Sequence, residues 1–205
     1  MMLYKIVSAF CYIVLKILFN FKVTGRENIP KDKNFILVSN HTSYFDPPIL
    51  GVATKIRLSY MAKEELFKNK IFGGLIRKLG AFPVSRGGGD IAAIKTAFKI
   101  LKAGGNMVIF PEGGRSKTKG MLRKGKSGAA LIATKAKVGI LPLGINADFK
   151  FRGKVTVTIG EYIDLSEYSD KKIDAETLQN ITDNIIMPEI ANLAGVKVYE
   201  NKSCR

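Results

Sequence analysis

Segments typical of strands and segments typical of helices alternate along this chain of 205 residues, and that alternation limits its fold most. Short apolar runs predict strands, and apolar residues spaced three or four apart predict helices. Strands are expected at 21–24, 35–39, 58–62, 81–84, 107–110, 139–145 and 155–159. Helices are expected from Asp46 onward, at 64–79, after a cap at Asp90, at 127–135 and at 174–193. The pattern predicts an α/β domain with a mostly parallel central sheet flanked by helices.

Three polar loops follow strands of this predicted sheet and span residues 40–46, 85–90 and 111–126. Ligands of open parallel sheets bind beyond the carboxyl ends of the strands. Because the carboxyl ends of parallel strands meet at one edge of a sheet, we expect the three loops to form a single site.

The only histidine, His41, stands five residues before Asp46. On an uninterrupted helix or strand the two side chains would not face each other. Pro47 disfavours a helical backbone at Asp46, so we expect the chain to reverse between the pair. Asp46 would then orient one imidazole nitrogen, and the other would act as a base. Spacing alone leaves the alternative that Asp46 caps a helix and His41 is an ordinary loop residue.

No residue in the sequence completes a nucleophilic triad with this pair. A Gly-x-Ser-x-Gly elbow is missing, and Cys11 and Cys204 lie far from the polar loops in the sequence. With one histidine and no cysteine cluster, neither a metal nor another cofactor is expected. The simplest chemistry is direct transfer, in which His41 deprotonates a bound alcohol that attacks an activated acyl carbon.

Four motifs extend the pattern around this pair. Asn40, His41 and Asp46 form Asn-His-x-x-x-x-Asp, and 80–86 reads Gly-Ala-Phe-Pro-Val-Ser-Arg. Residues 110–116 read Phe-Pro-Glu-Gly-Gly-Arg-Ser, and 140–144 form an apolar run around a proline. In order and spacing, these motifs resemble those of the glycerolipid acyltransferase family, specifically the 1-acyl-glycerol-3-phosphate acyltransferases.

The resemblance implies transfer of a fatty acyl group from acyl-CoA or acyl-acyl carrier protein to the free hydroxyl of lysophosphatidic acid. The product would be phosphatidic acid, for phospholipid biosynthesis. It implies that His41 and Asp46 are catalytic. It assigns acceptor binding to Arg86, Glu112, Gly113, Gly114, Arg115 and Ser116. Gly114 replaces the usual threonine and Ser85 a common acidic residue, which leaves the acceptor more open than the reaction.

The charge of the chain is strongly positive, with 33 Lys plus Arg against 17 Asp plus Glu. This excess predicts an anionic partner, such as membrane phospholipid, a phosphorylated acceptor or an acidic acyl donor. Residues 120–127 match the P-loop pattern, but a polar run rather than a strand precedes them, which argues against a nucleotide site. Aromatic residues are not interleaved with the basic residues, so a nucleic-acid partner is not expected.

Residues 1–20 are expected to form a membrane-associating helix, with the acyltransferase domain at 21–205. The uncharged stretch from Ile6 to Leu15 is short for a spanning helix. On a helix, a narrow polar stripe would consist of Lys5, Ser8, Tyr12, Lys16 and Asn20. We therefore expect a helix that lies in the interface of the cytoplasmic face of a membrane. A tilted spanning helix and a helix buried against the domain are the alternatives.

Two alternative functions stay open at this point. The enzyme could acylate a lysolipid other than lysophosphatidic acid. In the second alternative, the chain would be a non-catalytic basic module that binds membranes or nucleic acid. That module would not need His41, and salt would govern its binding.

Overall fold

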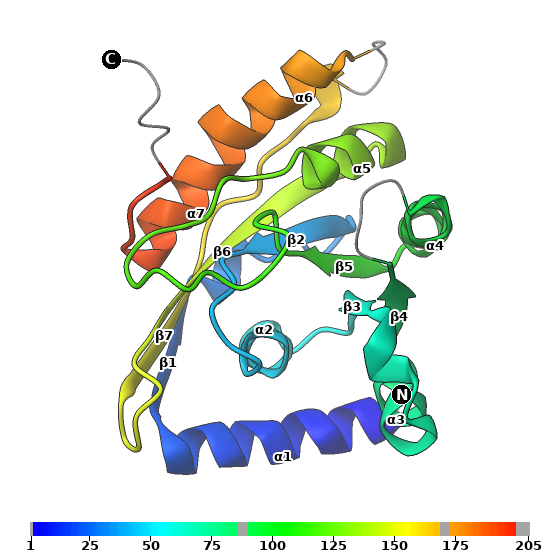
Figure 1. Ribbon diagram of the computed structural model, residues 1–205. Coiled ribbons are helices and arrows are strands. Elements are labelled where there is room, and N and C mark those ends of the chain that lie inside the picture. Colours follow the sequence, from blue (N-terminus) through cyan, green and yellow to red (C-terminus); the bar gives the residue numbers. More distant parts are fainter. Residues whose placement is uncertain (1, 86–89, 169–172, 200–205) are drawn as a thin grey trace.

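One seven-stranded sheet organises the molecule, and helices cover both of its faces (Figure 1). The computed structural model describes residues 2–85, 90–168 and 173–199. The strands are, in chain order, β1 (Asn20–Thr24), β2 (Phe35–Ser39), β3 (Leu58–Lys63), β4 (Ala81–Val84), β5 (Asn106–Ile109), β6 (Gly139–Ala147) and β7 (Lys154–Ile159). Their order across the sheet is β1-β7-β6-β2-β5-β3-β4. β6 and β7 pair antiparallel and the other neighbours pair parallel. The predicted α/β fold with a mostly parallel sheet is therefore confirmed.

The helices form two layers, one on each face of the sheet (Figure 1). They are α1 (Met2–Leu18), α2 (Asp46–Thr54), α3 (Lys70–Lys78), α4 (Ile91–Lys102), α5 (Gly128–Ala136), α6 (Ala175–Ile181) and α7 (Met187–Ala194). One layer contains α4, α5, α6 and α7, whose buried side chains share a single core cluster. The opposite layer contains α1 and α2, which contribute to a second cluster, and α3, which lines a cavity together with them.

The central strand β2 shows why the sheet needs both layers. All five of its residues are buried, as expected for a parallel strand covered on two faces. Ile36 and Val38 belong to the cluster with α4 to α7, whereas Phe35 and Leu37 belong to the cluster with α1 and α2. Successive side chains of a strand point to opposite faces, so one apolar run supplies both cores.

Two predicted helices are divided in the structure. In the segment 64–79, a 3-10 turn at Glu64–Phe67 precedes α3, because the side chain of Asn69 accepts hydrogen bonds from the Ile71 and Phe72 N–H groups and starts a new helix. In the segment 174–193, a π-helical turn at Thr182–Ile186 separates α6 from α7. Pro188 explains this turn, since it has no N–H to donate to the preceding turn.

The N-terminal helix α1 packs against α2 and has two different faces. Its inward face includes the buried Leu15, and the Tyr4 hydroxyl donates to the Ile56 carbonyl over 2.6 Å. Ile6, Phe10, Ile13 and Ile17 are exposed on its outward side. Ser8, predicted in the polar stripe, instead lines a cavity. Within the described residues, no helix combines the length and apolarity needed to cross a membrane.

Candidate active site

The loop between β2 and α2 brings His41 and Asp46 together. His41 Nδ1 lies 2.8 Å from Asp46 Oδ2. The same oxygen accepts hydrogen bonds from the N–H groups of Thr42 (2.7 Å) and Ser43 (2.8 Å). Asp46 is fully buried, so the carboxylate is held in one orientation. A proton on Nδ1 is directed to Asp46, which leaves Nε2 as the acceptor.

The chain reverses between the two residues, as the sequence predicts, but Asp46 does not cap a helix, and its backbone is helical although Pro47 was expected to disfavour that conformation. Phe45 occupies the cap position of α2, and Asp46 is already the first helical residue. The Asp46 N–H donates to the Ser43 carbonyl over 3.3 Å, which closes the turn. The Asp46 side chain therefore serves His41 and the loop backbone, and the helix-cap interpretation is wrong.

The backbone and ring of His41 are held by the loop that follows β5. The His41 N–H donates to Glu112 Oε1 over 2.8 Å, and the His41 carbonyl accepts from the Ser116 N–H over 2.7 Å. The ring of Phe110 stacks on the imidazole with centroids 4.1 Å apart. The loops 40–46 and 111–126 thus form one unit, as their places after β2 and β5 predict.

Asn40 fixes the same loop from the opposite side. Its Nδ2 donates to the Ile145 carbonyl, and its Oδ1 accepts from the Ile145 N–H, both over 2.8 Å. This pair of bonds continues the pairing of β2 with β6 one residue beyond the strand. The motif contains Asn40, but its spacing gave no indication of this supporting role.

Glu112 lies beneath the loop rather than at its surface. The residue is 1% exposed, and its Oε2 accepts from the Arg123 N–H over 2.7 Å while Oε1 accepts from His41. Burial raises the pKa of the Glu112 carboxyl, although these two N–H donors act in the opposite direction. The sequence assigned Glu112 to the acceptor, yet both oxygens bind backbone. Its geometry is that of a positioning residue.

Arg115 stands at the rim of the site. Its guanidinium lies 3.7 Å from the centre of the Tyr44 ring, and Nη2 donates to the Tyr44 hydroxyl over 2.9 Å. Arg115, Tyr44 and His41 line the same cavity. The remaining guanidinium N–H groups can bind the paired oxygens of a phosphate.

The turn of Gly113 and Gly114 is packed by two cations that the sequence did not single out. Gly113 adopts the left-handed conformation with φ +64°. A Cβ on Gly113 would meet the Lys126 side chain at 3.1 Å, and one on Gly114 would lie 2.8 Å from Arg123 Nη1. In the sequence, only the position of Lys126 and Arg123 in the basic stretch after the third motif pointed to these two residues.

The two remaining predicted residues are placed differently. The Ser116 hydroxyl bonds inside the loop, to the Met121 carbonyl over 2.9 Å. Arg86 lies outside the described residues. Next to it, the Ser85 hydroxyl donates to Glu64 Oε2 over 2.9 Å, and the Ser85 N–H donates to Asp90 Oδ2 over 2.7 Å.

A largely apolar cavity of about 680 Å³ extends from His41. It runs between α1, α2, α3 and the strands β3 to β5, and its walls include Val7, Val52, Met61 and Ile76. Among its polar residues, His41, Tyr44 and Arg115 come from the loops 40–46 and 111–126, and others come from α1 and β3. A long apolar group could therefore lie in the cavity with its reactive end at the imidazole.

Comparison with known proteins gives consistent matches. A family model described as Acyltransferase matches residues 20–146. The 1-acyl-sn-glycerol-3-phosphate acyltransferase of Streptococcus pneumoniae is 36% identical over 167 residues, covering 78% of this chain and 61% of that protein. This chain thus spans less than two thirds of that relative. The Bacillus subtilis protein of the same name is 33% identical over 174 residues, covering 82% and 85%.

A solved structure resembles nearly the whole chain. It is the crystal structure of the 1-acyl-sn-glycerophosphate (LPA) acyltransferase PlsC from Thermotoga maritima. It has a TM-score of 0.73 and 28% sequence identity, and the match covers 97% of this chain and 81% of that one.

Proposed function

This chain belongs to the acyltransferase family, and from that premise we propose that it acylates the free hydroxyl of lysophosphatidic acid to make phosphatidic acid. The observation that carries the proposal is His41, whose Nδ1 is bound by the buried Asp46 while the ring lines an apolar cavity with Arg115. The named relatives and the Thermotoga structure support the same acceptor.

The chemistry is a direct transfer between two bound substrates. His41 Nε2 takes the proton of the acceptor hydroxyl, and the oxygen attacks the carbonyl carbon of an acyl thioester. The tetrahedral intermediate collapses, the thiolate leaves, and the imidazolium returns the proton to the sulfur. Asp46 stabilises the imidazolium through Nδ1. Acyl-CoA and acyl-acyl carrier protein both supply such a thioester, and no further cofactor is proposed.

The acceptor phosphate is assigned to Arg115. The guanidinium is already oriented by the Tyr44 ring, so little side-chain freedom is lost on binding. Arg86 follows β4 in the sequence and is proposed as a second phosphate ligand on the family motif alone. Gly113 and Gly114 let the phosphate approach the loop backbone, and Ser116 and Glu112 hold that loop in place.

The apolar cavity is assigned to the fatty acyl chain, and α1 to membrane phospholipid. The cavity walls contain Val7 and Cys11 of α1, so the helix assigned to the lipid also borders the bound fatty acyl chain. The outward apolar side of α1, with Lys5 and Lys16 also exposed, suits the interface of an anionic bilayer. We place the enzyme on the cytoplasmic face, where acyl thioesters are available.

A different lysolipid acceptor is the second candidate. The observation that favours it is Gly114, where the family usually has threonine and where Arg123 Nη1 fills the adjacent space. A panel of lysolipids with and without a terminal phosphate, each with acyl-CoA and acyl-acyl carrier protein, separates the two. Lysophosphatidic acid should be the preferred acceptor.

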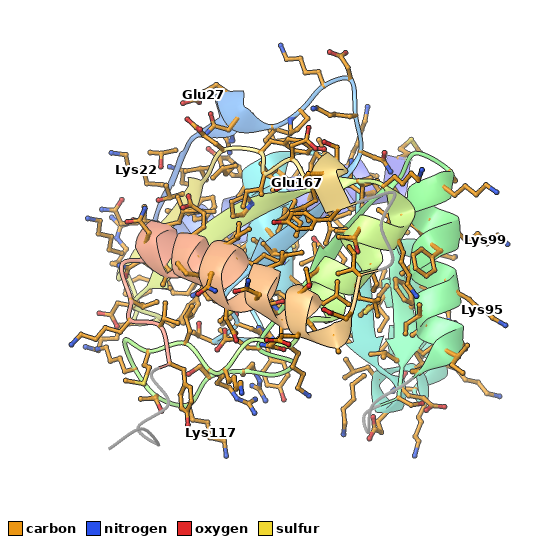
Figure 2. All side chains as sticks on the ribbon, turned by 90° about the horizontal axis from the view of Figure 1, so that it is seen from above. Lys22, Glu27, Lys95, Lys99, Lys117 and Glu167 are labelled. Atoms are coloured by element: carbon orange, nitrogen blue, oxygen red, sulfur yellow. The ribbon has the colours of Figure 1, made fainter. Side chains whose placement is uncertain are left out.

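The decisive test is His41→Ala in purified, detergent-solubilised protein. Removal of the base should lower the acyl-transfer rate about 10²- to 10⁴-fold. Lys117→Ala is the control, because Lys117 points away from the molecule (Figure 2). Acyl transfer by His41→Ala at the rate of the control would disprove the mechanism.

A further inference from the structure

Besides those of α1, large apolar side chains are exposed on α3 and in the turn between β6 and β7, two elements that lie near α1 in Figure 1. Phe10 of α1 is 65% exposed, Ile71 of α3 is 88% exposed, and Phe151 in the turn between β6 and β7 is 76% exposed. In Figure 1 the turn lies at one end of α1, and α3 lies at the other. Exposed apolar groups gathered on one side of a protein mark an interaction surface.

The helix α3 has one side toward the cavity and one side away from the protein. Ile76 and Phe72 line the cavity together with Tyr4 and Val7 of α1. Ile71, Leu75 and part of the Phe72 ring are exposed. Phe72 therefore lies at the boundary between the cavity and the outside, so α3 forms an outer rim of the cavity.

The turn after β6 is fixed to the other end of α1. The Arg152 N–H donates to the Leu18 carbonyl over 2.6 Å, and the ring of Phe149 meets that of Phe19 edge to face at 5.7 Å. These contacts fix the turn whose tip carries Phe151. The position of this exposed ring relative to α1 is thus set by the fold.

Basic residues stand beside each of the three exposed apolar groups. Lys5 and Lys16 are exposed on α1, Lys68 and Lys70 precede Ile71, and Lys150 and Arg152 flank Phe151. Interface cores between proteins are depleted in lysine. Apolar side chains bordered by lysine and arginine instead suit a bilayer with anionic headgroups, where the rings enter the acyl boundary and the cations meet phosphates.

We propose that α3 and the Phe151 turn contact lipid together with α1, so that the protein docks on an anionic bilayer at three points. With α3 at the bilayer surface, the rim at Phe72 faces lipid, and an acyl chain passes from the bilayer into the cavity beside it. The docking itself is independent of the reaction. The passage of the acyl chain rests on the proposed function.

The test is co-sedimentation of the full chain with vesicles of 70% phosphatidylcholine and 30% phosphatidylglycerol. Ile71→Ser/Leu75→Ser removes two exposed side chains that are not part of the cavity wall, and should weaken vesicle binding at least about tenfold. Phe151→Ser should weaken it several-fold. The control is Ile91→Ser, because Ile91 is also an exposed isoleucine but lies on α4, in the other layer.

Vesicle binding of Ile71→Ser/Leu75→Ser equal to that of Ile91→Ser would overturn the proposal. It would also be overturned if the double variant abolished a concentration-dependent self-association without vesicles, since a second copy would then cover the surface.

Acyl transfer by the double variant should be unchanged with substrates in detergent micelles, and it should fall with substrates in vesicles. Loss of acyl transfer in micelles as well as in vesicles would contradict the proposed passage of the acyl chain from the bilayer into the cavity. Absence of acyl transfer in the wild type under both conditions would count against the proposed function and leave the vesicle result valid.

Discussion

The two faces of the sheet are built from similar apolar strands but enclose different interiors. On the face covered by α4 to α7, side chains such as Ile186 and Ile190 are buried in a continuous core. On the face covered by α1 to α3, the helices surround a cavity of about 680 Å³ and leave apolar side chains outside. The comparison indicates that one layer supports the sheet, while the other is shaped for an apolar ligand.

The same division runs through the loops 40–46 and 111–126. Asn40 and Glu112 turn their polar groups to backbone N–H and carbonyl groups, and both are buried. His41 and Arg115 turn theirs toward the cavity. Substitutions on the supporting side should therefore change stability or loop position, and substitutions on the cavity side should change rate or selectivity.

After loss of His41 itself, Asp46→Asn should give the largest effect on activity. The amide retains the volume, but it cannot stabilise the imidazolium or fix the Nδ1–H form as the carboxylate does. We expect kcat to fall about 10³- to 10⁴-fold, as in other His–Asp pairs. Initial rates of acyl transfer at saturating substrate concentrations measure kcat, and thermal unfolding checks that the variant is folded. A variant with wild-type kcat would show that His41 acts without its partner.

Ile190→Ala tests the supporting layer, with Ile76→Ala as its counterpart at the cavity. Ile190 is almost fully buried in the core, so its truncation should cost about 2–5 kcal/mol of the free energy of unfolding. The activity of the folded fraction should not change. Ile76 borders existing space, so its truncation should cost less stability and should shift the preferred acyl chain length. Urea unfolding measures the two stability losses, and a series of acyl donors of different length measures the chain-length preference. Equal stability losses would contradict the proposed difference between the two layers.

Glu112→Gln should lower kcat about 10- to 100-fold, because a buried charge-assisted hydrogen bond contributes roughly 1.5–3 kcal/mol. The amide has one oxygen for two N–H donors, so either His41 or Arg123 loses its acceptor. Acceptor KM should change little, since the side chain does not face the cavity. A large KM effect at constant kcat would instead indicate a direct substrate ligand.

The pH dependence of stability provides a second measurement on the same residue. Burial raises the folded-state pKa of Glu112, so its protonated form is favoured by folding. The stability that this titration contributes is fully present below the unfolded-state pKa and is lost as pH rises through the folded-state pKa. The free energy of unfolding of wild type minus that of Glu112→Gln should therefore decrease with rising pH. A difference that increases would show that the two N–H donors outweigh burial.

The sequence predicted the order of elements and the meeting of His41 with Asp46, because apolar periodicity and the turn before Pro47 are local properties. Strand pairing is not local, so the reversed direction of β7, which β1 shares, was not foreseen. The role of Glu112 depends on residues 113–126 folding back, where the Lys126 N–H reaches the Pro111 carbonyl over 2.9 Å. Which side of α1 is buried and which is exposed likewise depends on distant segments, because α2 packs on one side of the helix and the turn of Phe151 bonds to its end.

Gly114→Thr should give the smallest effect and tests whether this position sets acceptor preference. The new Cβ would lie 2.8 Å from Arg123 Nη1, so the flexible guanidinium has to move. We expect kcat to change less than twofold and the acceptor KM to change a few-fold, because the imidazole and its partners are not displaced. Arg123→Gln is the matched variant, and it should shift acceptor KM in the same assay. If Gly114→Thr changed kcat more than KM, the turn of Gly113 and Gly114 would belong to the catalytic side of the division rather than to acceptor recognition.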